Sequence, residues 1–304
     1  MDNMRGIILM VIGMAGFAAE DMFIKLAASG LPVGQILGLL GFFGALAFAA
    51  YARLNGTSVL SKGFFHPAVM LRNVSEMLGG LCFVTALTLI PLATVTTILQ
   101  ATPLLVTMGA ALVLGEAVGW RRWTAILVGF CGVMLVIRPG FDGFDTNVLW
   151  VVLGVLGLAV RDLASRKVPR AITSLQLAAW GFFAVGVSGA VLVLVTGEAE
   201  IPTVRETGYL AGALVVGVVA YWALTEATRT GEIGVVTPFR YVRLVFSTFI
   251  GMLVFAEFPD GYTLAGACII IATGIYTIMR ERTRRRLEAA QLRASAAAPG
   301  EALL

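Results

Sequence analysis

Ionisable side chains interrupt several long apolar stretches of this chain at regular spacings. Three pairs of opposite charge stand four residues apart: Asp21 with Lys25, Arg72 with Glu76, and Asp162 with Arg166. At this spacing both members lie on one face of a helix, so we expect ion pairs within single helices. A second interpretation stays open for the carboxylates of Asp21 and Asp162, which could face a cavity and carry a proton.

Arg240 and Arg243 raise a sharper question, because they lie well inside an apolar stretch that begins near residue 233. At about 1.5 Å per residue, Arg243 would lie about 15 Å along a helix from that point. A guanidinium at such a depth needs a carboxylate or a bound anionic group. The carboxylates available to it are those of Glu20, Glu76, Asp162 and Glu226. Both alternatives, an ion pair and an anchor for a ligand, stay open.

Amide, aromatic and proline residues near these charges complete the candidate site. We expect a substrate to be bound by Arg240, Arg243, Tyr241, Gln100, Trp222 and Glu76. We assign charge balance or proton coupling to Asp21, Asp162, Glu20 and Glu226. Pro103 and Pro238 cannot donate a backbone hydrogen bond, so we expect hinges there. Equally, the aromatic rings could pack against lipid, and the amides could link helices.

The composition indicates what kind of protein positions these side chains. Of the 304 residues, 59% are hydrophobic and only 13% are charged, and the mean hydropathy is +0.91. Soluble domains carry about 25% charged residues. A soluble domain and a disordered chain are therefore excluded, and a multi-pass membrane protein is predicted.

The reactive residues are too few for catalysis. The three cysteines, Cys82, Cys131 and Cys268, lie singly in apolar stretches, and the one histidine, His66, precedes a proline. We therefore expect no disulfide framework, no metal site and no cofactor. An intramembrane enzyme would need a nucleophile with a base, a metal or a carboxylate pair, so we expect no enzyme.

Ten apolar stretches are long enough to cross a membrane as helices. They lie at about 6–27, 33–52, 68–89, 93–114, 123–138, 148–167, 174–196, 208–228, 233–256 and 263–279. With the N-terminus in the cytoplasm, fifteen Lys and Arg residues fall in cytoplasmic segments and three on the opposite side. The positive-inside rule therefore places both termini in the cytoplasm.

The chain also repeats itself at a shift near 141 residues. Asp21 and Lys25 then fall on Asp162 and Arg166, and Leu114-Gly115-Glu116 falls on Phe255-Ala256-Glu257. We expect two repeats, at 4–140 and 147–280, followed by a basic, disordered cytoplasmic tail at 281–304. Each repeat holds five spans, and because five is odd the second repeat must be inverted relative to the first, as in many secondary transporters.

These repeated motifs resemble a known family. Pro91-Leu92-Ala93 through Leu114-Gly115-Glu116 to Arg138-Pro139-Gly140, and Thr237-Pro238-Phe239-Arg240-Tyr241 through Glu257 to Arg280-Glu281, are similar to two EamA domains. The resemblance, to the EamA family of the drug/metabolite transporter superfamily, covers residues 4–280. It implies ten helices, alternating access, and a central cavity lined by the first, third, fourth, sixth, eighth and ninth helices. Similar proteins carry amino acids, riboflavin, S-adenosylmethionine, sugar phosphates or organic cations.

We therefore expect an all-α membrane protein that works as a secondary transporter. It would move a small polar or planar metabolite, such as an amino acid, riboflavin or an S-adenosylmethionine-like compound, across the cell inner membrane. No nucleotide-binding loop is present, so ATP is not expected to drive it directly. The expected partners are the small-molecule substrate, the lipid bilayer and coupled protons, without nucleic acid, in a monomer or a homodimer. The alternative is a flippase for lipid-linked or amphipathic cargo.

Overall fold

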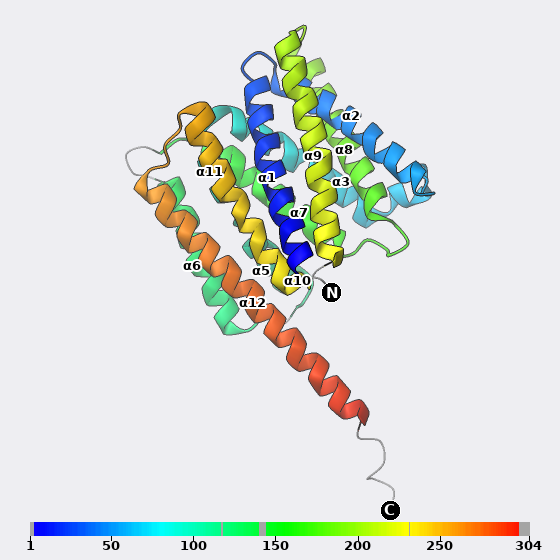
Figure 1. Cartoon of the computed structure of the whole chain (residues 1–304), viewed down its shortest axis with the longest axis vertical. Coiled ribbons are helices and arrows are strands. Elements are labelled where there is room, and N and C mark those ends of the chain that lie inside the picture. The colour runs from blue at the N-terminus through cyan, green and yellow to red at the C-terminus, as the bar shows by residue number, and fades with distance from the viewer. Residues whose placement is uncertain (1–2, 117, 140–143, 231, 298–304) are drawn as a thin grey trace, which may run out of the picture.

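The computed structural model describes residues 3–116, 118–139, 144–230 and 232–297, and all regular elements in these ranges are helices (Figure 1). The first half contains α1 (Asn3–Ala27), α2 (Val33–Leu54), η1 (Lys62–Phe65), α3 (Pro67–Leu89), α4 (Leu92–Leu99), α5 (Thr102–Val113) and α6 (Trp120–Ile137). The second half contains α7 (Val148–Ser165), α8 (Ser174–Thr196), α9 (Val204–Thr230), α10 (Ile233–Val236), η2 (Thr237–Tyr241), α11 (Val242–Phe255) and α12 (Gly261–Ala297).

Nine stretches within the described ranges are long and apolar enough to cross a membrane. They are α1, α2, Leu92–Val113, α6, α7, α8, α9, Thr237–Phe255 and Gly261–Arg280. The third predicted stretch, 68–89, forms the 23-residue helix α3 but is not one of the nine. Arg72, Asn73 and Glu76 lower the mean hydropathy of α3, and all three line or approach the interior rather than the outer surface.

Two of the predicted helices are interrupted near their middle. The fourth stretch is broken at Gln100 and Ala101, between α4 and α5, and Pro103 lies in the first turn of α5. The ninth stretch consists of α10, the 3₁₀ turn η2 and α11, with Pro238 at the start of η2. A proline has no amide hydrogen and fits the first turn of a helix, which explains why the interruptions occur where they do.

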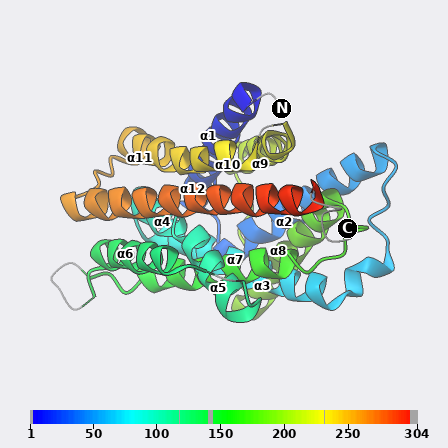
Figure 2. The same cartoon turned by 90° about the horizontal axis from the view of Figure 1, so that it is seen from below.

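The two halves of the chain pack against each other in reciprocal pairs of helices. The principal contacts join α1 to α9, α3 to α7, α2 to α8, and α6 to α12, which lie alongside each other in Figures 1 and 2. In addition, α1 packs on α11 and α7 packs on α5. The helices α1, α2, α3, α5 and α6 of the first half correspond to α7, α8, α9, α11 and α12 of the second. When corresponding helices are exchanged, the α1–α9 contact becomes α3–α7, the α1–α11 contact becomes α5–α7, and the α2–α8 and α6–α12 contacts stay the same.

The contact between α2 and α8 depends on glycines that bring the two backbones together. A Cβ atom added at Gly41 would lie 2.2 Å from the backbone nitrogen of Gly186, and one added at Gly189 would lie 2.2 Å from the nitrogen of Gly38. Small residues permit this close helix packing in a bilayer, where van der Waals contact drives association.

The ends of α5 and α11 have the same local geometry. Gly115 and Ala256 both adopt a left-handed conformation, with φ of 70° and 53°. In each case the backbone amide of the next residue donates a hydrogen bond to a carbonyl of the preceding helix. Glu116 donates to Ala110 (3.1 Å), and Glu257 donates to Gly251 (3.0 Å). These positions correspond at the shift of 141 residues, so the repeat in the sequence is also a repeat of backbone detail.

The last helix is longer than expected. We expect disorder from residue 281, but α12 continues to Ala297; residues 298–304 lie outside the described ranges. The segment after 280 is rich in Arg, Leu, Glu, Gln and Ala, and these residues have high intrinsic helix propensity. Once α12 has formed in the apolar part, extending it therefore requires no new nucleus.

Candidate functional site

A cavity of about 750 Å³ lies between the two halves of the chain. Its polar lining comprises Glu20 and Asp21 from α1, Arg72 and Glu76 from α3, Gln100, Thr102 and Thr107 near the α4–α5 interruption, Arg161, Asp162, Ser165 and Arg166 of the α7 segment, Tyr221 from α9, and Thr237, Arg240, Tyr241 and Arg243 from η2 and α11. The helices named by the family resemblance all contribute. Residues of α2 and α8, such as Gly41 and Phe182, also contribute to the lining.

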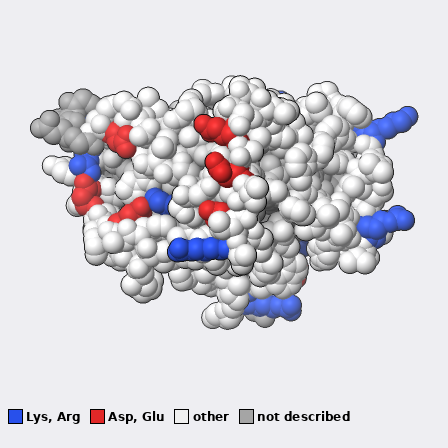
Figure 3. Space-filling model, turned by 90° about the horizontal axis from the view of Figure 1, so that it is seen from above, with Lys and Arg blue, Asp and Glu red and all other residues white. Residues whose placement is uncertain are grey.

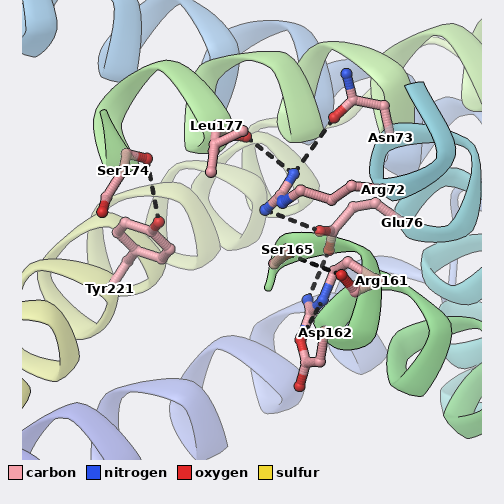
Figure 4. Close-up of polar contacts among 9 residues, drawn as sticks. All are labelled: Arg72, Asn73, Glu76, Arg161, Asp162, Ser165, Ser174, Leu177 and Tyr221. Atoms are coloured by element: carbon pink, nitrogen blue, oxygen red, sulfur yellow. Dashed lines mark hydrogen bonds and ion pairs between the residues drawn. The ribbon is translucent and has the colours of Figure 1, made fainter. Parts of the chain in front are cut away.

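One side of the cavity holds a network of four charges from α3 and α7. Arg72 and Glu76 form the predicted pair within α3, at 3.3 Å. Glu76 is shared with Arg161, at 2.9 Å, and Arg161 also contacts its neighbour Asp162, at 2.8 Å. Figure 4 shows these four side chains in a chain of contacts, with Arg72 also donating to the carbonyl oxygen of Leu177. The network is neutral and joins the two halves.

The other side of the cavity holds an ion pair between Arg243 and Asp21. The guanidinium of Arg243 lies 2.6 Å from the carboxylate of Asp21, whose side chain is 3% exposed. The same guanidinium lies over the rings of Phe17 (5.3 Å) and Phe83 (6.0 Å). Arg243 therefore has a carboxylate partner, but it is none of the four that the sequence suggested.

Two of the three predicted ion pairs within helices are wrong. Lys25 contacts Glu257 at 2.6 Å rather than Asp21, and Arg166 contacts Glu116 at 2.7 Å rather than Asp162. In both cases a carboxylate at the end of a facing helix replaces the one on the same helix. A helix spacing shows which charges share a face, but it cannot show what the neighbouring helix presents to that face.

Glu116 and Glu257 are the polar residues whose role sequence reasoning missed. The sequence shows them only as corresponding positions of the repeat, whereas in the structure each carboxylate forms an ion pair with a basic side chain of the other half. The carboxylate of Glu257 also accepts from the amide of Leu92 (2.8 Å), while Lys25 donates to the carbonyl of Ile90 (2.7 Å). The available signal was the repeat itself, because Glu116 recurs as Glu257 at the shift at which Lys25 recurs as Arg166.

Gln100 and Arg240, which correspond in the repeat, meet at the two interrupted helices. The side-chain amide of Gln100 donates to the backbone carbonyl of Arg240 at 3.2 Å. The Arg240 side chain is exposed, although the residue lies within a predicted span, because it extends into the cavity. Within the part of the chain that the structure describes, no ion pair involves Arg240.

Of three other predicted residues, Tyr241 belongs to the cavity lining, and Trp222 and Glu226 do not. Tyr241 is 4% exposed, and its ring is directed toward Gly274, where an added Cβ would collide with the phenol oxygen. Trp222 is 47% exposed and is not part of the cavity lining. Glu226 accepts a hydrogen bond from Thr230 (3.3 Å) and is also outside the lining. Of the two prolines, Pro103 lines the cavity and Pro238 does not.

Over most of its length the chain is similar to proteins named as transporters. It is 25% identical to the S-adenosylmethionine uptake transporter of Rickettsia felis, over 92% of this chain and 94% of that protein. It is 26% identical to a pseudopaline exporter of Pseudomonas aeruginosa, over 89% of this chain and 94% of that protein. A riboflavin transporter of Rhizobium johnstonii is 29% identical to this chain, over 71% of this chain and 72% of that protein.

Structure and family comparisons agree with this similarity. A solved structure, described only as a crystal structure of a protein, matches with a TM-score of 0.59 at 20% identity, over 88% of this chain and 97% of that one; at this identity it supports the fold alone. The model of the EamA-like transporter family matches twice, at residues 4–138 and 146–280. The chain therefore belongs to the EamA-like transporter family.

Proposed function

We propose that this protein is a secondary transporter that moves a small polar or planar metabolite across the cell inner membrane by alternating access. The observation that carries the proposal is the 750 Å³ cavity between the two halves, which is lined by charged residues of both. Ligand sites commonly measure about 300–1,000 Å³ and combine an apolar wall with a few polar groups. Here the apolar wall includes Phe17, Phe83 and Phe182.

We propose further that ten helices cross the membrane as two inverted repeats, with both termini in the cytoplasm. The reciprocal helix pairs support the repeat, as do the matching left-handed residues Gly115 and Ala256. As the tenth span we propose α3, whose charges meet partners in the interior. The orientation is proposed from the positive-inside rule, because most bases are predicted on the side opposite the face on which α9 begins. That face carries Asp and Glu near its centre, with Lys and Arg beside them and at its edges (Figure 3).

Alternating access would use the two corresponding ion pairs at the ends of the cavity. The side chains of Lys25 and Glu257 are only 13% and 19% exposed, whereas those of Arg166 and Glu116 are 40% and 43% exposed. Arg166 lines the cavity, and Lys25 does not. We propose that the cavity is closed at Lys25, reaches solvent near Arg166, and reverses this state during transport, with bending at Pro103 and Pro238.

The predicted site residues would have different roles in transport. Arg240 and Gln100 would contact the substrate, and Glu76, Arg243 and Tyr241 would shape the cavity walls. Among the carboxylates proposed for charge balance or a coupled proton, Asp21 and Asp162 are held by arginines, and Glu20 lines the cavity. Trp222 and Glu226 lie outside the lining, so we do not propose substrate contacts for them.

The relatives support the class of cargo. The names of three of them give S-adenosylmethionine, pseudopaline and riboflavin as what they move. None of the three names gives a lipid as what is moved, so they do not favour the alternative of a lipid flippase. Since the family is one of transporters, we propose transport without catalysis.

The test is transport by the purified full-length chain in liposomes. The panel consists of the twenty common L-amino acids, S-adenosylmethionine, riboflavin and sugar phosphates, each offered without ATP, with and without a pH gradient. We expect at least one compound to exchange across the liposome membrane at a rate that saturates with concentration and exceeds that of empty liposomes. Exchange of none of them, or exchange that requires ATP, would contradict the proposal.

A further inference from the structure

A groove of about 400 Å³ lies on the outside of the helix bundle, between α6 and α12. These two helices lie side by side at one edge of the molecule (Figure 1). Among the described residues, none lines both this groove and the central cavity. The lining of the groove includes Trp120, Arg121, Thr124 and Val128 of α6, and Ala272 and Tyr276 of α12. All six are exposed, so the groove opens toward the surrounding lipid.

The two helices run antiparallel, and their glycines show where they are level with each other. A Cβ atom added at Gly132 of α6 would lie 3.1 Å from the carbonyl oxygen of Gly266 of α12. One added at Gly129, which is earlier in α6, would lie 2.9 Å from Oγ1 of Thr273, which is later in α12. Gly129 and Thr273 therefore lie at the same depth.

Arg121 and Arg280 lie close to one depth at the rim of the groove. At about 1.5 Å per residue, Arg121 lies about 12 Å from Gly129 along α6. In the same direction, Arg280 lies about 10 Å from Thr273 along α12. Arg121 belongs to the lining, and Arg280 lies on the same face of α12 as Tyr276, which precedes it by four residues. Packed helices are about 8–10 Å apart, so both long side chains can reach one ligand between them.

Neither arginine has a carboxylate partner within the described part of the chain. Arg121 lies over the ring of Trp120, at 5.4 Å, and the side chain of Arg280 is exposed. None of the described residues that line the groove is acidic. The positive charge at the rim is therefore available to a ligand.

The opposite end of the same helix pair shows the partner that is missing at the groove. There Arg138, which corresponds to Arg280 in the repeat, forms an ion pair with Asp260. Asp260 directly precedes α12, whereas the residue that directly precedes α6 is Gly119. At the groove, a residue without a side chain thus takes the place of the carboxylate, and the repeat leaves Arg280 without the partner that Arg138 has.

The groove lies where lipid headgroups meet acyl chains. Trp120 is the first residue of α6, and Tyr276 lies one turn before the end of the apolar span Gly261–Arg280. Trp and Tyr are enriched at this depth of a bilayer. The positive-inside rule assigns this end of the two helices to the cytoplasm, and the cytoplasmic leaflet is the one with a negative surface potential.

We propose that the groove binds an anionic phospholipid of the cytoplasmic leaflet, with its phosphate between Arg121 and Arg280 and an acyl chain along Val128 and Ala272. Guanidinium groups bind phosphate oxygens through paired, charge-assisted hydrogen bonds. A zwitterionic lipid would bring its own cation next to two arginines, and a soluble phosphate would leave the apolar part of the groove empty. The site is separate from the central cavity, so it does not depend on which compound is transported.

The experiment measures lipid binding to the purified, delipidated full-length protein in detergent by native mass spectrometry. Phosphatidylglycerol and phosphatidylcholine with the same oleoyl chains are compared through the dissociation constant of the first lipid bound. We expect phosphatidylglycerol to bind about tenfold more tightly. Glycerol 3-phosphate at the same concentration should not displace it, because this compound has no acyl chain.

A double variant tests the charge of the site. In Arg121→Gln/Arg280→Gln, the two lipids should bind within about threefold of each other. The matched control, Arg53→Gln/Arg170→Gln, loses the same charge at exposed positions that are predicted on the same side of the membrane, and it should keep the full preference. The basic residues after 280 are present in every variant and cancel in the comparison. Because the preference is a ratio within one variant, partial unfolding does not change it.

A second variant tests the shape of the site. Ala272→Phe fills the groove and leaves its charges unchanged, so phosphatidylglycerol should bind as weakly as it does to the double variant. Ala50→Phe, at an exposed position of α2, is the matched control and should bind phosphatidylglycerol as the wild type does.

The proposal is overturned if the wild-type protein binds phosphatidylglycerol no more tightly than phosphatidylcholine, as expected if a second copy of the chain covered the groove. It is also overturned if Arg121→Gln/Arg280→Gln keeps the preference, if Ala272→Phe binds like the wild type, or if glycerol 3-phosphate displaces the lipid. None of these outcomes bears on the proposed transport function, which is tested in liposomes by the movement of soluble compounds.

Discussion

Lys25 of α1 and Glu257 at the end of α11 form an ion pair whose side chains are only 13% and 19% exposed, whereas its counterpart, between Arg166 and Glu116, is exposed. The two pairs join corresponding positions of the repeat at 2.6 Å and 2.7 Å. Their surroundings differ, since Lys25 also donates to Ile90, and Glu257 accepts from Leu92. The Lys25–Glu257 pair thus belongs to a network of hydrogen bonds, whereas within the described part of the chain the side chains of Arg166 and Glu116 make no such backbone contacts.

The Lys25–Glu257 pair should therefore stabilise the fold more than the Arg166–Glu116 pair does. Replacing Lys25 by Met leaves the carboxylate of Glu257 largely buried without its base, and loss of one partner of a buried pair costs about 3–5 kcal/mol. Arg166→Met removes the corresponding base at an exposed position, where ion pairs contribute about 0–1 kcal/mol. Denaturant unfolding in detergent measures both losses. Equal losses of unfolding free energy in the two variants would show that the Lys25–Glu257 and Arg166–Glu116 pairs stabilise the fold equally, contrary to this prediction.

The pair of Arg243 and Asp21 makes a second prediction. Arg243→Gln should destabilise the fold by about 3–5 kcal/mol, because Asp21 is left charged in an apolar interior. Adding Asp21→Asn removes the uncompensated charge, so the double variant should recover part of the loss. The unfolding free energies of the wild type, the two single variants and the double variant together form a double-mutant cycle. Wild-type stability of Arg243→Gln would show that the pair is not structural.

The left-handed residues at the ends of α5 and α11 make a third prediction. Gly115 adopts φ of 70° without a side chain, whereas Ala256 adopts φ of 53° with one. Left-handed geometry costs a non-glycine residue about 1–2 kcal/mol. Ala256→Gly should therefore stabilise the protein by about 1 kcal/mol, and Gly115→Ala should destabilise it by a similar amount, as read from thermal unfolding. Changes of the same sign in the two variants would refute this explanation.

Asp260, which precedes α12, makes stability depend on pH. Burial alone would raise the pKa of Asp260, but hydrogen bonds from Thr263 and the neighbouring guanidinium of Arg138 outweigh it and hold the pKa below 3.8. A carboxyl whose pKa is lower in the folded state stabilises the fold above its unfolded pKa of about 3.9, and this contribution disappears as the pH falls through the folded value.

Comparison with Asp260→Asn isolates this effect. The difference in unfolding temperature between the wild type and the variant should be constant from about pH 5 to pH 7 and should shrink below about pH 4. Other carboxyl groups titrate in both proteins and cancel in the difference. A difference that stays unchanged down to pH 3 would show that Asp260 is not held as a carboxylate.

The sequence predicted the helices well, because their signal is local. Apolar length located the helical stretches to within a few residues, except that α12 continues to Ala297, and the prolines at 103 and 238 marked the two interrupted helices. The third stretch is less hydrophobic than the others, because α3 contains Arg72 and Glu76, which form ion pairs in the interior.

The partners of the charged residues could not be predicted in the same way. Spacing along one helix correctly paired Arg72 with Glu76, but it assigned Lys25 to Asp21, whereas the structure joins Lys25 to Glu257, 232 residues away. Such pairs depend on how helices of the two halves face each other. The same limitation applied to Trp222, since a ring next to charged residues in sequence can still point outward.

The central claim is that substrate passes through the cavity between the halves, and labelling inside the cavity tests it most directly. Val106 lines the cavity, whereas Val160 of α7 is 41% exposed and lies outside the lining. In a chain with Cys82, Cys131 and Cys268 replaced by Ala, Val106→Cys and Val160→Cys are each treated with a charged methanethiosulfonate reagent before transport is measured in liposomes. The account predicts that labelling stops transport by Val106→Cys, that saturating substrate slows this labelling, and that Val160→Cys keeps its activity. Undiminished transport after complete labelling of Val106→Cys would contradict it.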